Sequence, residues 1–173
     1  HANARAGLLG NYLGQVCNEG QHTYSCVESP YEAIAAVNGV QHTANATGCD
    51  VDSTDDSGMK AAIEQAKAAD TIIFVGGLDT SSIEMEGKDR HKIGLPGLQP
   101  SLLSQLLALG KPLAFVLFHG FFRLFRELDA SCRFSRGSSS SVLATSAFCR
   151  RSSLARAAEL ARAFCSAAAR AAS

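Results

Sequence analysis

Several signals that the chain lacks exclude whole classes of protein. Its 173 residues contain no uninterrupted apolar stretch of about 18 residues, so no membrane span is predicted. No CxxC pair occurs, and Cys17 and Cys26 with His22 between them fit the spacing of a zinc site poorly, so we expect no metal. The sequence has neither a G-x-G-x-x-G dinucleotide fingerprint nor a G-x-S-x-G nucleophile elbow. We therefore predict no cofactor.

The net charge of zero conceals two regions of different composition. Residues 1–120 hold 7 basic and 13 acidic residues, whereas residues 121–173 hold 9 arginines, no lysine and 3 acidic residues. With 46% hydrophobic and 18% charged residues, the chain as a whole is typical of one soluble globular domain or of part of a larger one. We divide it into a domain over 1–120 and an Arg-, Ala- and Ser-rich tail over 121–173.

Helical and strand-like segments alternate within residues 1–120. Apolar spacing and end signals predict helices over 30–38, 55–69 and 98–109. The continuous apolar runs at 71–75 (TIIFV) and 112–118 (PLAFVLF) are typical of strands that are buried on both faces of a parallel sheet. This alternation predicts a layered α/β sheet, with ligand-binding groups on loops at the carboxyl ends of the strands.

The loop after the first of these strands, residues 76–90, is long and rich in carboxylates. Two interpretations of it remain open. It is either a solvated surface loop in which Asp89 and Arg90 form local ion pairs, or a site where one carboxyl group gives and takes a proton. Composition alone favours the first interpretation.

Cysteine spacing and one short motif bear on cellular location. The segment between Cys17 and Cys26 contains Gly and Thr and can turn back on itself, which favours a disulfide between these two residues. Asn45-Ala46-Thr47 is an N-glycosylation triplet, so Asn45 is a candidate acceptor. Both features agree with a secreted or lysosome-like protein. The chain opens at His1 without a signal peptide, and we expect it to be a fragment.

A set of ordered motifs resembles glycoside hydrolase family 3, especially its β-xylosidase branch. The resemblance covers about residues 1–120 and implies the family's second domain, a three-layer α/β/α sandwich with a mostly parallel sheet, here incomplete. Its motifs are HANA (1–4), LLGNYLG (8–14), SPYEAI (29–34), GCDV (48–51), GGLD (76–79), EMEGKDR (84–90), LPGLQ (95–99) and LGKP (109–112).

The resemblance also implies a chemistry. Family members are retaining glycosidases, in which two carboxyl groups about 5 to 5.5 Å apart act on the glycosidic bond. The nucleophile is an aspartate of a (β/α)8 barrel, and the general acid/base is a glutamate just before Gly-x-Asp-Arg. By this motif Glu86 is the acid/base, with Glu84 as the alternate, and Asp89 and Arg90 support the loop.

The implied partners are a β-linked xylo- or gluco-oligosaccharide and the barrel domain, with neither nucleic acid nor membrane. A barrel needs about 200 residues, so we expect the isolated chain to be inactive. The alternative is a non-catalytic α/β module that binds carbohydrate or protein. We expect the tail to be helical or disordered; its abrupt composition also suggests a frameshifted reading of GC-rich DNA.

Overall fold

The computed structural model describes residues 2–5, 8, 17, 24–79, 83, 87, 90–92, 94–119, 133–136 and 143–149. Three α-helices, a 3-10 turn and four strands lie in these ranges. They are, in chain order, α1 (Pro30–Asn38), the turn η2 (Val40–His42), α2 (Met59–Ala68), β1 (Ile72–Gly77), α3 (Gln99–Ala108), β2 (Leu113–His119), β3 (Arg133–Arg136) and β4 (Leu143–Cys149). None of the described helices is long and apolar enough to cross a membrane.

The four strands form one sheet in the order β1-β2-β4-β3. β1 and β2 run parallel, with Phe74 opposite Phe115, as the buried runs in the sequence predict. The crossover between them contains α3, which is the connection that parallel neighbours require. β4 pairs antiparallel with β2 and with β3, so the sheet is mixed further along. Only residues 137–142 separate β3 from β4, too short a link for a parallel crossover.

Both of these later strands fall in residues 121–173, where we expected helix or disorder. That prediction is wrong for 133–136 and 143–149. Strand formation there follows from pairing, because the free edge of β2 offers a ladder of backbone donors and acceptors to any extended neighbour. Intrinsic preferences for strand are weak and yield to such a context.

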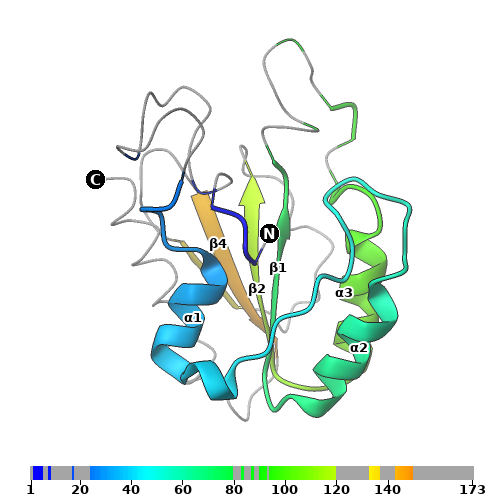
Figure 1. The fold of residues 1–173 in the computed structure, drawn as a ribbon. Helices are drawn as coiled ribbons and strands as arrows, with labels where there is room; N and C mark the ends of the chain where they lie inside the picture. Colours follow the sequence, from blue (N-terminus) through cyan, green and yellow to red (C-terminus); the bar gives the residue numbers. More distant parts are fainter. Residues whose placement is uncertain are drawn as a thin grey trace.

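Alternate side chains of β1 and β2 enter two separate apolar layers, and Figure 1 shows the helices that cover them. Ile72, Phe74 and Phe115 pack with α2 and α3 on one face of the sheet. Val116 and Phe118 pack on the other face with Ala33 of α1 and with parts of the N-terminal segment. The layered α/β/α architecture predicted from the sequence is therefore confirmed.

The helix ends show where local signals hold and where they fail. α1 begins at Pro30, as predicted, with Ser29 and Glu32 forming a capping box. α2 begins at Met59 rather than near residue 55, and its N-cap is Gly58. The hydroxyl of Ser57, which precedes Gly58, donates a hydrogen bond to the Asp55 carboxylate and does not cap the helix. A Cβ at Gly58 would lie 2.4 Å from a backbone oxygen of the 43–51 segment, so the close approach requires glycine there.

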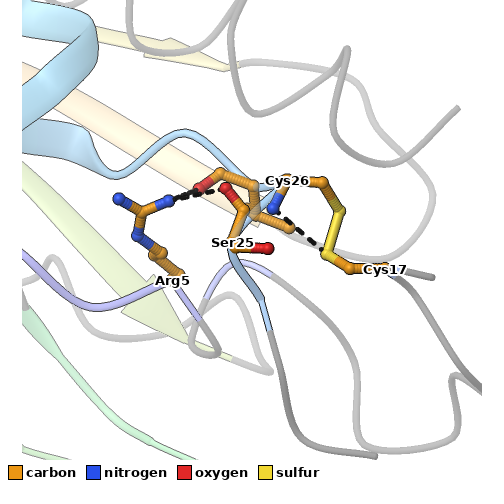
Figure 2. The surroundings of a disulfide bond; sticks show 5 residues. Arg5, Cys17, Ser25 and Cys26 are labelled. Carbon is orange, nitrogen blue, oxygen red and sulfur yellow. Dashed lines mark hydrogen bonds between the residues drawn. A yellow bond between two sulfur atoms is a disulfide. The ribbon is translucent and has the colours of Figure 1, made fainter. Parts of the chain in front are cut away.

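Polar contacts and a disulfide hold the N-terminal segment beside α1. Arg5 donates hydrogen bonds of 2.9 Å to the carbonyls of Ser25 and Val27, and it forms an ion pair with Glu32. Cys17 and Cys26 are joined by a disulfide in which the Cα atoms are 5.8 Å apart. Figure 2 shows the Arg5 guanidinium directed at the Ser25 carbonyl, next to this disulfide.

Candidate functional site

The acidic loop leaves the sheet at the carboxyl end of β1, through a turn that requires glycine. Gly77 has φ +119°, and a Cβ there would lie 2.1 Å from the carbonyl oxygen of Phe118. The following amide, that of Leu78, donates a 2.8 Å hydrogen bond to this same oxygen. The start of the loop is thus fixed against the end of β2, at the edge where ligand groups are expected in a parallel sheet.

A single buried side chain, that of Gln99, joins the two ends of the loop. Its Oε1 accepts a 2.7 Å hydrogen bond from the Gly77 amide, and its Nε2 donates 2.8 Å hydrogen bonds to the carbonyls of Gly77 and Val51. Gln99 is only 3% exposed, and it is the first residue of α3. In the structure the connection from β1 to α3 begins at residue 77 and ends at residue 99, beyond the 76–90 range taken from the sequence, and one amide group holds both of its ends.

The described residues of the loop differ in how deeply they are buried. Ile83 is buried, whereas Gly87 is exposed with φ +77°. Arg90 is half-buried and donates a 3.3 Å hydrogen bond to the Gly94 carbonyl. A Cβ at Gly97 would lie 2.7 Å from the backbone nitrogen of Ser53, so the end of the loop that leads into α3 packs tightly against the 48–53 segment.

The carboxylates that the sequence singles out lie outside the described residues. These are Glu86, its alternate Glu84, and Asp89. Their roles stay predictions; what the structure describes is the frame of the loop, by which we mean Gly77, Leu78, Gly97 and Gln99 with their contacts. Arg90, the fourth residue of that prediction, contacts Gly94 within the same loop, and its supporting role also stays a prediction.

The remaining candidates are a glycosylation acceptor, a metal site and a free cysteine. Asn45 is exposed on the extended segment that follows η2, where a glycosylation acceptor has to be accessible. Among the residues that the structure describes, no cluster of His, Cys, Asp and Glu could hold a metal ion. Burial, and secondarily the Asp50 carboxylate, raises the pKa of the Cys49 thiol, which disfavours the reactive thiolate.

Gln99 is the functional residue that our reasoning from the sequence missed. In the sequence it stands only as the last residue of the motif Leu95-Pro96-Gly97-Leu98-Gln99. The available signal was a polar residue at a position where the helical apolar pattern of α3 turns inward, ahead of Leu102, Leu103 and Leu106. A buried amide in such a place needs partners, and the structure supplies them at Gly77 and Val51.

Similar proteins of known family identify the family of this chain. The family model described as "Glycosyl hydrolase family 3 C-terminal domain" matches residues 1–132, and so extends beyond the range of about 1–120 given by the resemblance. A protein of Aspergillus fumigatus named "Probable exo-1,4-beta-xylosidase" is 33% identical over 120 residues, which are 69% of this chain and 14% of that protein. One of the same description from Aspergillus japonicus is 40% identical over 107 residues, 62% of this chain and 12% of that protein.

A solved structure gives the same answer. It is titled as a GH3 exo-β-xylosidase in complex with a xylobiose aziridine activity-based probe, and it is 37% identical with a TM-score of 0.52. The match covers 65% of this chain and 13% of that one. The chain thus spans about one seventh of the length of the curated relatives that it matches. On the family match and these relatives, the chain belongs to glycoside hydrolase family 3 and corresponds to its C-terminal domain.

Proposed function

We propose that the chain forms the part of a retaining β-xylosidase that presents the general acid/base to a catalytic barrel domain. Glu86 is the acid/base in this proposal, with Glu84 as the alternate. The observation that carries it is the Gln99 bridge, because this bridge fixes both ends of the carboxylate-rich loop at the carboxyl edge of a parallel strand pair. The names of the relatives support the xyloside as substrate.

The chemistry divides between the two domains. The barrel supplies an aspartate nucleophile that forms a glycosyl-enzyme intermediate. The loop carboxyl protonates the leaving oxygen in the first step and takes a proton from water in the second. For the first step it has to be protonated at working pH, which requires a pKa raised by burial against substrate and barrel. A loop with free ends would lose the fixed distance of about 5 to 5.5 Å between the two carboxyl groups.

Contacts of the described residues hold the loop in position at several points. Gln99 and the Leu78 amide fix the start, and the close packing of Gly97 on Ser53 fixes the return. Ile83 anchors one point between them. The segments between these points are left to approach a partner domain and a sugar, as active-site loops on a rigid scaffold do.

A secreted or lysosome-like location belongs to the same proposal. The disulfide between Cys17 and Cys26 and the exposed Asn45 triplet are both features of an oxidising secretory route.

The test is a domain replacement in the Aspergillus japonicus relative. Residues 1–119 of this chain replace the matched segment, and hydrolysis of aryl β-xylosides with poor and good leaving groups is measured. We expect Glu86→Gln to lower kcat/KM for poor leaving groups by about 10²- to 10⁴-fold and to spare good ones, because only poor leaving groups need protonation. Asp56→Asn, at an exposed residue ahead of α2, is the matched control and should leave both rates unchanged.

Two outcomes would contradict the proposal in different ways. If Glu84→Gln produces the leaving-group dependence and Glu86→Gln does not, the acid/base is the alternate residue. If the replaced enzyme is active and neither substitution matters, the loop carries no acid/base, and a non-catalytic binding module becomes the better description.

A further inference from the structure

The disulfide beside α1 joins two cysteines of very different exposure. Cys17 is only 3% exposed and packs with Leu8, Val27 and Phe118 in the apolar layer on the α1 face of the sheet. Cys26, its partner, is an exposed residue. Because thiol–disulfide exchange depends on access to the sulfur that is attacked, a thiolate in solution reaches this bond from the side of Cys26.

A backbone donor faces the sulfur on the buried side. The amide of Cys26 donates a 3.2 Å hydrogen bond to Sγ of Cys17, which Figure 2 shows as a dashed line. A donor in this place stabilises negative charge on the sulfur and offsets part of the cost of burying that charge. The arrangement therefore favours attack at Cys26 and departure of Cys17 as the thiolate.

Contacts other than the disulfide also hold the turn that carries Cys26. The amide of Val27 donates a 3.0 Å hydrogen bond to the carbonyl of Tyr24, which closes the turn. Arg5 donates 2.9 Å hydrogen bonds to the carbonyls on either side of Cys26, those of Ser25 and Val27. None of these bonds involves sulfur, so they can persist when the disulfide opens and keep Cys26 opposite Cys17.

We propose that the Cys17–Cys26 bond is a reversible redox switch, in which Cys26 exchanges with a low-molecular-weight thiol such as glutathione and Cys17 is the resolving residue. The thiolate attacks Sγ of Cys26 and forms a mixed disulfide, while the Cys17–Cys26 bond breaks and its electron pair leaves on Cys17, which takes a proton from water. A second thiolate then attacks the mixed disulfide. It releases the oxidised form of the small thiol and leaves Cys26 reduced, so two thiols pass two electrons to the protein.

The reduced state keeps the apolar layer and loosens the turn. A buried thiol packs as a small apolar side chain, so Cys17 can stay in its cluster after reduction. The turn, however, loses its covalent tie to that cluster, and Arg5 is then bonded to carbonyls of a less firmly held segment. The redox state of the two cysteines thus sets how firmly the N-terminal segment is attached beside α1.

The first test uses two single variants of the 173-residue chain and oxidised glutathione. In Cys17→Ser the exposed Cys26 keeps its thiol but has no resolving partner, so a stable mixed disulfide should accumulate there. In Cys26→Ser the buried Cys17 should take up glutathione at least tenfold more slowly. Rates are measured by acid quenching and mass spectrometry, and peptide mapping separates these adducts from those of the other four cysteines.

The second test measures what Arg5 contributes to closing the bond. The parent chain is equilibrated with mixtures of reduced and oxidised glutathione, and the fraction of closed disulfide gives an equilibrium constant. Arg5→Met removes both hydrogen bonds to the turn and should lower this constant at least fivefold, because Cys26 then lies opposite Cys17 less often. Lys67→Met removes an exposed cation that pairs with Glu64 and is the matched control, which should leave the constant unchanged.

Two measurements on the parent chain compare the open and closed states. Reduction should speed hydrogen exchange at the Val27 amide at least tenfold and leave exchange at Phe74 of β1 unchanged, as followed by NMR. Far-ultraviolet circular dichroism should be the same in both states.

Four results would overturn the proposal. The first is equal uptake of glutathione by Cys17 and Cys26 in the single variants. The second is a bond that glutathione does not open, or a chain that loses its circular dichroism on reduction, since the disulfide would then be purely structural. The third is an unchanged equilibrium constant in Arg5→Met, and the fourth is unchanged exchange at Val27. None of these measurements depends on glycosidase activity, so they test the switch separately from the role of Glu86.

Discussion

The two faces of the sheet are held by different kinds of interaction. On the side of α2 and α3, buried apolar residues form one continuous cluster centred on Phe115. On the side of α1 the buried cluster is smaller, and the N-terminal segment is held in addition by Arg5, by the capping box at Ser29 and by a disulfide. The first layer follows from hydrophobic periodicity, whereas the second depends on single residues that no periodic pattern reveals.

The apolar face should be the more sensitive of the two to truncation of a core side chain. Phe115 is completely buried in the α2 and α3 cluster, so we expect Phe115→Ala to lower the free energy of unfolding by about 3 to 5 kcal/mol. Chemical denaturation followed by circular dichroism measures this. Val37→Ala, at an exposed residue of α1, should change stability by less than about 0.5 kcal/mol. A loss below about 1 kcal/mol at Phe115 would contradict the assigned core.

The α1 face should instead respond to loss of its covalent link. Replacing both Cys17 and Cys26 by serine removes a constraint on a short loop of the unfolded chain, and we expect a loss of about 2 to 3 kcal/mol. Reduction of the parent chain should lower its stability similarly and leave the double variant unaffected. Mass spectrometry after alkylation without reduction checks the bond itself, since free thiols at both positions would disprove it.

Substitution of Gln99 should show how much a single buried amide contributes to the free energy of unfolding. Gln99→Leu keeps the apolar packing but leaves the Gly77 amide and two carbonyls without their partner, so we expect a loss of about 2 kcal/mol. Faster hydrogen exchange should be confined to the Gly77 amide and the start of the loop. Gln105→Leu, on the exposed face of the same helix, is the control and should do neither. Uniform loss across the domain would mean that Gln99 serves the core rather than the loop.

These contrasts also explain how far the sequence alone leads. The helix from Pro30 and the buried strand around Phe74 follow from local signals that agree with one another: a cap, a proline and an unbroken apolar run. The strands β3 and β4 were missed because β4 depends on pairing with β2, a long-range contact that composition does not encode, and β3 in turn pairs with β4. Within the site, Glu86 is predicted from its motif and stays a prediction, whereas the contacts of Gln99 became visible only once Gly77 and Val51 were brought beside it.

The smallest expected effect concerns acid stability on the α1 face. The backbone hydrogen bond from Ser29, then its side chain and the Arg5 charge, lower the pKa of Glu32 from its usual value of 4.5. A carboxyl group whose pKa is lowered by folding stabilises the fold above pH 4.5, and that contribution is lost as the pH falls through the lower folded value. Unfolding free energy should therefore decline below pH 4.5, and less steeply in Glu32→Gln, whose amide can still complete the capping box at Ser29.

Glu64→Gln is the comparison, because Glu64 contacts only the exposed Lys67 in the described structure and its pKa is also lowered. Salt should remove the Glu64 effect and leave most of the Glu32 effect, since the latter rests first on a backbone hydrogen bond rather than on a screened ion pair. Equal slopes for the parent chain and Glu32→Gln in urea titrations from pH 3 to 6 would mean that the capping box contributes nothing to acid stability.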